Sequence, residues 1–146
     1  MRVLVQRVKK ASVCVGGHHI AGIGYGLLLF VGVGKTSTQH DIEDMAKKIA
    51  GLRIFEDADG KMNLDIRQVE GEILSVPQFT LYADTKKGNR PGFSEAALPG
   101  QAKSSWQALN RFLVGLGLIV TEGIFGAHME IELVNDGPVT IWLNDR

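Results

Sequence analysis

The chain has 146 residues, 45% hydrophobic and 22% charged, so we expect one globular domain over residues 1–146. Sixteen basic and sixteen acidic side chains give a formal net charge of zero, which excludes a global field that draws the protein onto long nucleic acid or an anionic membrane. The single cysteine excludes an intramolecular disulfide framework, and charges interrupt the N-terminal apolar residues where a signal peptide needs an unbroken run. No apolar run approaches the roughly 20 residues of a membrane span. These features predict a cytoplasmic protein.

The first third of the chain is rich in predicted strands. Residues 2–8 alternate apolar and polar side chains, and residues 12–15 form a second β-prone run before a turn at Gly16-Gly17. Residues 26–33 are apolar on both faces, which is typical of a strand buried within a layered structure. We therefore expect this strand to be central.

A helix is predicted over residues 39–52, after three hydroxyl residues that can cap its N-terminus. Apolar side chains repeat at helical spacing along it: Ile42, Met45, Ile49 and Leu52. A short strand at residues 53–55 and a turn at residues 56–60 follow.

The second half alternates strands with a loop and a helix. Residues 71–81 predict a strand that Pro77 interrupts, and residues 83–101 lack periodicity, as in a long ordered loop that carries function. A second helix is predicted over residues 102–117.

The C-terminal part predicts two more strands, at residues 129–133 and 139–143, joined by a turn at residues 135–138. Many strands and two main helices indicate a mixed α/β fold, with layered β-sheets or a barrel-like β core and both helices on one side.

Several familiar motifs are incomplete. Gly34-Lys35-Thr36 resembles the end of a phosphate-binding loop, but Leu29 stands where that loop needs its first glycine. The four histidines and Cys14 show no zinc-ligand spacing. We therefore predict neither a metal nor a cofactor.

Two segments carry polar groups in unusual settings. Strand periodicity over residues 76–81 sends Gln78 and Thr80 to one face, so that an amide and a hydroxyl project together. In the second segment, Gly137 precedes Pro138, and only before proline is a cis peptide bond inexpensive.

Together these segments resemble the D-aminoacyl-tRNA deacylase (D-Tyr-tRNA deacylase) family, whose two signatures read Ser-Gln-Phe-Thr and Asn-x-Gly-Pro-Val-Thr. The second signature is complete at residues 135–140. Further matches cover the whole chain in order: residues 6–8, 52–57, 60–63, 87–91 and 126–129.

The resemblance implies a homodimeric hydrolase that cleaves D-amino acids, and mischarged glycine, from tRNA and rejects L-aminoacyl-tRNA. It places the catalytic groups at Gln78, Phe79 and Thr80. It implies a cis Gly137-Pro138 bond that projects into the partner's pocket, where its carbonyls act as a chiral filter. The side chain of a D-amino acid points outward there, whereas that of an L-amino acid clashes. Pro77 and Arg90 are the remaining expected substrate contacts.

The sequence departs from the family pattern at Pro77, where serine is usual. Proline there is similar to an animal branch of the superfamily that removes L-alanine from mischarged tRNA. Phe79 and Val139 follow the D-specific pattern instead, so we expect D-specificity. Proline fixes φ and removes a backbone donor, which affects the pocket beside Gln78.

Two mechanisms are open. Thr80 can attack the ester, although nothing nearby in the sequence supplies a base. Alternatively, the terminal ribose hydroxyl of the RNA assists water, while backbone N–H groups near Phe79 and Thr80 hold the ester carbonyl; we favour this second mechanism. The single-stranded 3′ end would be held by stacking and by cations. The candidate cations are Arg7, Lys9, Lys10, Lys86, Lys87 and Arg90.

Two other kinds of protein compete with this interpretation. One is a hydrolase of small esters or amides that uses Cys14 or Thr80, which predicts activity without RNA. The other is a non-catalytic module that binds RNA ends, which predicts binding without release of an amino acid.

Overall fold

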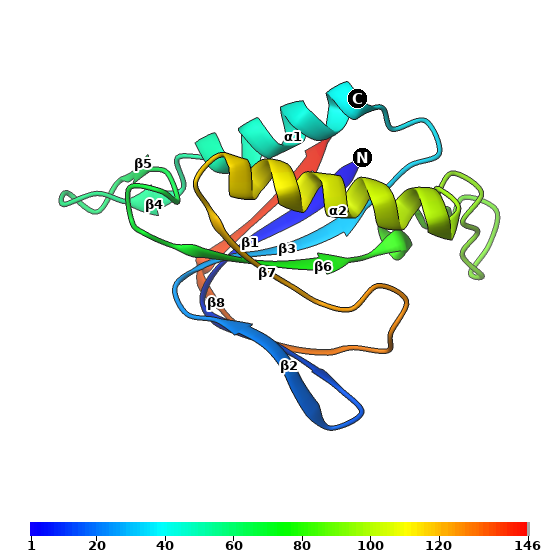
Figure 1. Ribbon diagram of the computed structural model, residues 1–146, viewed down its shortest axis with the longest axis horizontal. Helices are drawn as coiled ribbons and strands as arrows, with labels where there is room; N and C mark the ends of the chain where they lie inside the picture. Colours follow the sequence, from blue (N-terminus) through cyan, green and yellow to red (C-terminus); the bar gives the residue numbers. More distant parts are fainter. Residues whose placement is uncertain (146) are drawn as a thin grey trace.

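The computed structural model describes residues 1–145 and shows a curled sheet with both long helices on one side (Figure 1). The strands are β1 (Arg2–Val15), β2 (His18–Ile23), β3 (Gly26–Gly32), β4 (Phe55–Glu56), β5 (Met62–Leu64), β6 (Glu72–Pro77), β7 (Ile119–Glu122) and β8 (Glu130–Asn144). The helices are α1 (Gln39–Gly51), the short 3-10 helix η1 (Phe79–Tyr82) and α2 (Pro99–Gly115). The predicted mixed α/β class, with a barrel-like sheet and two main helices on one side, is confirmed.

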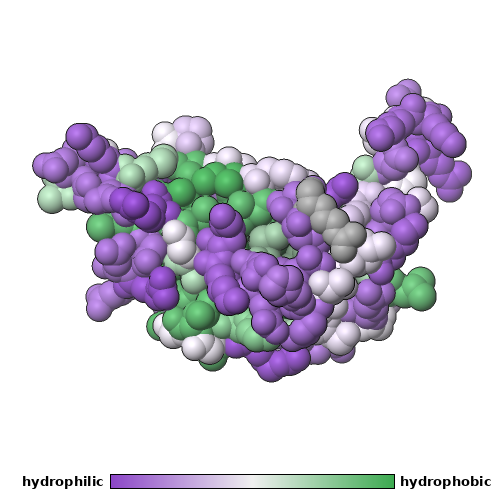
Figure 2. All heavy atoms as spheres, turned by 90° about the horizontal axis from the view of Figure 1, so that it is seen from above, coloured by the Kyte–Doolittle hydropathy of each residue, from purple (hydrophilic) through white to green (hydrophobic). Residues whose placement is uncertain are grey.

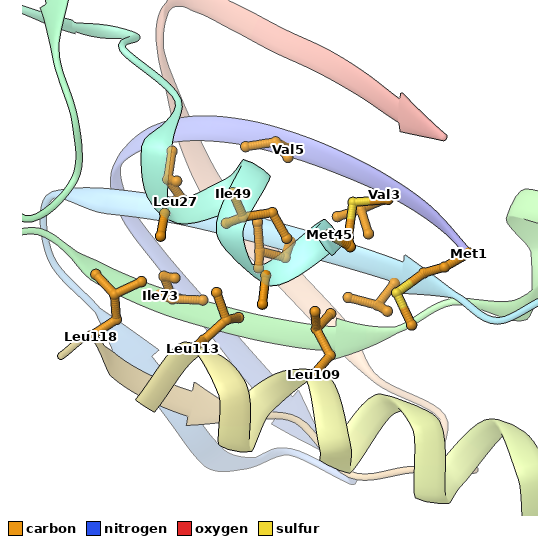
Figure 3. Close-up of a cluster of buried hydrophobic side chains, with 14 of the residues drawn as sticks. Met1, Val3, Val5, Leu27, Met45, Ile49, Ile73, Leu109, Leu113 and Leu118 are labelled. Carbon is orange, nitrogen blue, oxygen red and sulfur yellow. The ribbon is translucent and has the colours of Figure 1, made fainter. Parts of the chain in front are cut away.

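The main sheet has the strand order β2-β1-β3-β6-β7, so β3 is central, as predicted. It pairs antiparallel with β1 and parallel with β6. Successive side chains of β3 enter different cores: Leu27 and Leu29 pack under the helices, whereas Leu28 packs in a cluster on the other face. Figure 3 shows the helix-side core, in which Leu109 and Leu113 of α2 face the sheet.

β1 is one long strand, and the prediction of two separate strands is wrong. Its first half pairs with β3 and with the end of β8, and its second half pairs with β2 and with the start of β8. Exposed Lys9 and Lys10 interrupt the apolar pattern, but the ladder with β8 continues past them through register shifts. This double pairing curls the sheet and creates its second layer.

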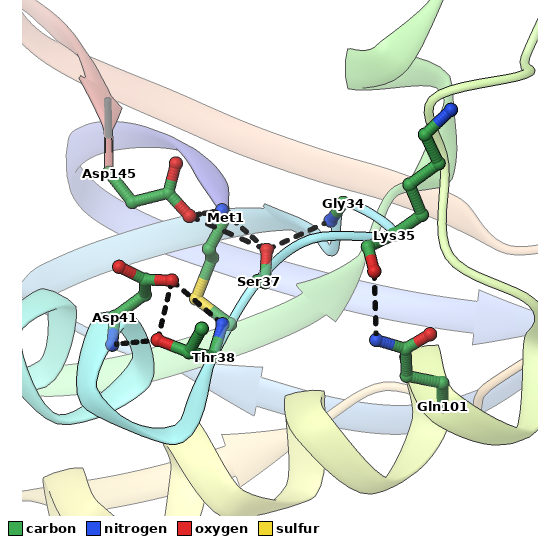
Figure 4. Close-up of polar contacts among 8 residues, drawn as sticks. All are labelled: Met1, Gly34, Lys35, Ser37, Thr38, Asp41, Gln101 and Asp145. Atoms are coloured by element: carbon green, nitrogen blue, oxygen red, sulfur yellow. Dashed lines mark hydrogen bonds and ion pairs between the residues drawn. The ribbon is translucent and has the colours of Figure 1, made fainter.

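The first helix forms for the predicted reason. The Thr38 hydroxyl accepts the Asp41 N–H at 3.2 Å, and the Asp41 carboxylate accepts the Thr38 N–H at 2.7 Å, which is a complete capping box (Figure 4). The second helix begins at Pro99, earlier than the predicted residue 102, because proline is favoured in the first turn of a helix. The strand predicted at residues 53–55 is displaced to β4, and β2 and β7 were not predicted.

Polar contacts tie the N-terminus of the described chain to the loop after β3 (Figure 4). The Met1 ammonium forms an ion pair with Asp145 and donates to Ser37 Oγ at 2.6 Å. Ser37 Oγ also accepts the Gly34 N–H at 3.2 Å. Within residues 1–145, no helix combines the length and apolarity that crossing a bilayer requires.

The turn between β4 and β5 depends on Asp57. Its Oδ1 accepts the N–H groups of Lys61 at 3.1 Å and Asp59 at 2.9 Å. The Lys61 hydrogen bond is the main cause that lowers the pKa of Asp57; burial opposes it and the Asp59 hydrogen bond supports it. A carboxylate with a lowered pKa in the folded state stabilises the turn above its unfolded pKa, and that contribution is lost as the pH falls through the folded pKa.

We expect an NMR titration of the Asp57 side-chain carboxyl to show a midpoint below the ordinary aspartate value of about 3.9. Asp57→Asn should remove the acid-dependent loosening of this hairpin while the helix signals stay unchanged. A midpoint at or above the ordinary value contradicts the assignment.

Candidate active site

The segment that holds Gln78 and Thr80 is a helical turn, and the prediction that they share the face of a strand is wrong. The Gln78 N–H donates to Val31 O at 2.7 Å, which is the last bond to β3, and the chain then turns into η1. The strand cannot continue because β3 itself ends at Gly32. Gln78 and Thr80 nevertheless lie together, since the Gln78 side-chain amide donates to Thr80 Oγ1.

A pocket of about 610 Å³ opens beside η1. It lies between the ends of β3 and β6, the loop before α2, the first turns of α2 and the segment 125–129. Pro77, Gln78 and Phe79 line it, and the remaining lining is mainly apolar, including Phe93 and Trp106. A concave, mainly apolar pocket with a few polar groups is typical of a site that binds a small molecule and fixes its orientation.

Arg2 and Tyr82 fix η1 against the sheet. Arg2 Nη1 donates to Leu81 O at 2.9 Å, and its guanidinium carbon lies 4.3 Å from the centroid of the Tyr82 ring. Tyr82 is buried and packs against the backbone of Gly34, where an added Cβ would lie 2.6 Å from the Tyr82 hydroxyl oxygen. The position of η1 therefore depends on the absence of a side chain at residue 34.

Pro77 stands where the pairing of β6 on the β7 side ends. The neighbouring Gln78 N–H points to β3, so the nitrogen of Pro77 faces the β7 side. On that side the ladder ends at the pair Ser75 and Glu122, and the Gly123 N–H still donates to Ser75 O at 2.9 Å. Proline has no N–H with which to extend this ladder, so the pairing ends there.

Thr80 has no base beside it. Among residues 1–145, the side chain that hydrogen-bonds to Thr80 Oγ1 is the amide of Gln78, which cannot take up a proton at neutral pH. The first N–H groups of a helix have no partner within the helix, and in η1 these belong to Phe79 and Thr80. The turn is therefore better suited to donate hydrogen bonds to an oxyanion than to supply an activated hydroxyl.

The second signature segment forms a bulge inside β8, so the predicted turn between two strands is also wrong. Thr140 pairs with Gln6 and Asn135 pairs with Val8, which leaves residues 136–139 opposite Arg7 alone. After the bulge the chain continues in the same direction along the same partner strand. The periodicity of the sequence shows where the strand pattern is interrupted, but it does not show that pairing with β1 resumes afterwards.

Asn135 clamps the bulge. Its Oδ1 accepts the Val139 N–H at 2.9 Å, and its Nδ2 donates to Thr140 Oγ1 at 3.0 Å. Gly137 has a φ of +127°, and an added Cβ would lie 2.8 Å from Val139 Cγ2. The Gly137-Pro138 bond is cis, as the resemblance implies. Gly137 and Pro138 are exposed and Val139 is buried, so the tip of the bulge faces outward from the chain.

Arg7 supports this bulge from below, a role that sequence analysis missed. Its side chain is buried, with 2% of the residue exposed. Nη1 donates to Ile54 O at 2.7 Å, and Nε lies 3.1 Å from Asp136 O and 3.2 Å from Asp136 Oδ2. Burial raises the pKa of nearby Tyr25, and the positive charge of Arg7 opposes that shift. Because its donors are occupied and buried, Arg7 is unavailable to bind RNA.

Within one chain, the two predicted parts of the site, η1 and the Gly137-Pro138 segment, lie far apart. Arg2 lies opposite Gly32, where η1 sits, whereas Arg7 and the bulge lie at the level of Leu27. At about 3.3 Å per residue, the distance along β3 between these levels is roughly 16 Å. Figure 1 shows the same separation, with η1 and the bend of β8 at opposite ends of the sheet.

The other sequence candidates lie outside the pocket. Arg90 is exposed in the loop after η1 and does not line the pocket. Cys14 pairs with His19 across β1 and β2, also away from the pocket. Within residues 1–145, no three His, Cys, Asp or Glu side chains form a group that could hold a metal ion.

Comparison with known proteins identifies the family. A sequence profile described as D-Tyr-tRNA(Tyr) deacylase matches residues 4–144. The chain is 58% identical to a D-aminoacyl-tRNA deacylase from Chloroherpeton thalassium, covering 98% of this chain and 95% of the relative. It is 55% identical to one from Staphylococcus epidermidis, covering 97% and 93%.

Two solved structures share the fold. One, called "c-Myc DNA Unwinding Element Binding Protein", has a TM-score of 0.93 at 40% identity and covers 99% of this chain and 98% of its own. The other, described as "a probable eukaryotic D-amino acid tRNA deacylase", has a TM-score of 0.82 at 17% identity and covers 97% of each chain, which is a likeness of fold alone. The sequence matches over nearly the full length decide the assignment: the chain belongs to the D-aminoacyl-tRNA deacylase family.

Proposed function

We propose that this protein hydrolyses the ester bond of D-aminoacyl-tRNA and of mischarged glycyl-tRNA in the cytoplasm, and that it rejects L-aminoacyl-tRNA. The observation that carries the proposal is the exposed Gly137-Pro138 tip, built as an outward projection and distant from the pocket of its own chain. Its family membership supplies the reaction class.

The separation of the two halves supports a homodimer with composite active sites. In a twofold dimer, the tip of each subunit enters the pocket of the other, and both contacts form at once because the interface is reciprocal. The buried Arg7 and the Asn135 clamp keep the tip in one conformation. A rigid tip made of backbone atoms can discriminate between D- and L-aminoacyl esters by shape alone.

The filter acts on the configuration at the α-carbon. Backbone carbonyls of Gly137 and Pro138 bind the substrate on one side, so an L side chain points into the tip and a D side chain points outward. Glycine has no side chain and passes the filter. Pro77 and Phe79 form the adjoining pocket wall, and Arg90 contacts the RNA outside it.

The chemistry that the site supports best is RNA-assisted hydrolysis. The N–H groups of Phe79 and Thr80 hold the ester carbonyl, and Gln78 orients the reacting end. The terminal ribose hydroxyl then positions or activates water. An aminoacyl ester is already reactive, so positioning accounts for much of the rate without a catalytic triad.

The test is the rate of amino-acid release from D-Tyr-tRNA, L-Tyr-tRNA and Gly-tRNA by wild type and Thr80→Ala. We expect the D ester and the glycyl ester to be cleaved at least about 100-fold faster than the L ester. Thr80→Ala should keep substantial activity because its hydroxyl has no base. Loss of all activity in this variant, with its fold intact, would instead favour a threonine nucleophile.

Other outcomes contradict the proposal. Binding of tRNA without release of any amino acid indicates a non-catalytic module. Cleavage of small free esters at a similar rate indicates an RNA-independent hydrolase. A preference for L-Ala-tRNA would show that Pro77 marks a change of specificity.

A further inference from the structure

An exposed arm, residues 84–92, begins immediately after η1 and returns to the pocket at Phe93. Asp84 and Gly92 close it with a pair of backbone hydrogen bonds of 2.8 and 2.9 Å. The Asp84 carboxylate also accepts the Lys86 N–H at 2.9 Å, which orders the first turn of the arm. In Figure 2 the arm stands out from the body as a hydrophilic projection at the right.

The arm concentrates positive charge on a chain whose formal net charge is zero. Lys86, Lys87 and Arg90 are exposed, and none of them forms an ion pair within residues 1–145. Among the other exposed cations, Lys35 pairs with Glu95 and Lys47 pairs with Asp44, whereas Lys48 and Lys61 form no ion pair within the described residues. These three cations outnumber the single carboxylate of the arm, Asp84, so the short projection is a local positive site for a polyanion.

The base of the arm is firmly attached at the mouth of the pocket. The Phe79 and Phe93 rings meet edge to face, with centroids 4.9 Å apart. The chain just beyond is bound to the loop after β3, since the Lys35 N–H donates to Glu95 O at 3.0 Å and the Ala97 N–H donates to Val33 O at 2.9 Å. These contacts fix the base of the arm at the mouth of the pocket.

We propose that the arm binds phosphate groups of the single-stranded 3′ end of the substrate RNA. This inference rests on the proposed function, which places the terminal nucleoside and its ester in the pocket. The preceding phosphates then leave through the mouth, where the arm begins. The arm projects from the body at this point, so it can follow the RNA strand outward (Figure 2). Lysine and arginine bind phosphate oxygens through charge-assisted hydrogen bonds.

The experiment compares an arm variant, K86Q/K87Q/R90Q, with a matched control, K47Q/K48Q/K61Q, which removes three exposed lysines from other surfaces. Cleavage of D-Tyr-tRNA is measured as kcat/KM over a salt series, alongside D-tyrosyl-adenosine, which has no phosphate. The dissociation constant for uncharged tRNA is measured over the same series, so the arm is tested even if no ester is cleaved.

Each phosphate contact to a single strand contributes about 0.7 to the slope of log affinity against log salt, so the arm variant should have a slope smaller by about 2. Between about 50 and 200 mM salt, wild type should lose about 20-fold more kcat/KM on tRNA than the arm variant. The control should follow wild type. The preference for tRNA over D-tyrosyl-adenosine should fall in the arm variant alone.

Equal salt slopes for wild type and the arm variant, in both cleavage and binding, would overturn the inference. The same change in the control variant would also overturn it, because the effect would then follow overall charge. If wild type binds tRNA with the expected salt dependence but cleaves no ester, the proposed function is contradicted and the assignment of the arm stands.

Discussion

Replacing Arg7 with methionine is expected to lower the free energy of unfolding by about 3 to 5 kcal/mol. Methionine fills much of the same space, but Ile54 O and Asp136 O lose their donor, and the Asp136 carboxylate loses its partner. The bulge also loses its support, so kcat/KM for D-aminoacyl-tRNA should fall by about 100-fold even in the folded fraction. Urea unfolding and single-turnover cleavage measure the two effects separately.

Arg7→Lys is the informative control. Lysine keeps the positive charge but lacks the planar fork that reaches two carbonyl oxygens at once. We expect intermediate stability and activity. If the methionine variant has the same free energy of unfolding and the same kcat/KM as wild type, Arg7 does not support the bulge.

Gly34→Ala should reduce kcat while the protein remains folded. The added methyl group would lie 2.6 to 2.9 Å from the end of the Tyr82 ring, which is buried and stacked beneath Arg2, so the ring and η1 must shift together. Overpacking of this kind costs about 1 to 3 kcal/mol. A displacement of η1 by even 1 Å should lower kcat by about 100-fold, because the N–H groups of Phe79 and Thr80 move with it.

Gly51→Ala provides the matched control, since a Cβ there meets nothing within 4 Å. It should have wild-type kcat and equal or slightly higher stability. The double variant Gly34→Ala/Tyr82→Phe removes the closest contact and should recover part of the activity. Wild-type kcat in Gly34→Ala alone would show that η1 does not depend on this contact.

Sequence patterns predicted those elements whose causes are local. Helix α1 has its apolar repeat and its capping residue in one stretch of chain, and β3 is apolar on both faces because both are buried. The resemblance to the family depended on short segments and was equally visible. These features need no knowledge of what lies across the fold.

Features that depend on residues far apart in the sequence were missed or predicted wrongly. The turn into η1 depends on β3 ending at Gly32, and the continuity of β8 depends on pairing with β1 on both sides of the bulge. The role of Arg7 depends on Ile54 and Asp136, which come from two other parts of the chain. An isolated arginine in an alternating strand gives no signal of such partners, so it was grouped with surface cations.

The pairing of β1 with β8 also constrains how the protein folds. The register joins Arg2 to Asn144, so β1 waits for a partner strand that is synthesised much later. Pairings between such distant segments have a high loop-closure cost and are associated with slow folding. Until β8 arrives, one edge of β1 stays open to other strands. During synthesis, protection of this edge is therefore the step at which a chaperone would most improve the yield of native protein.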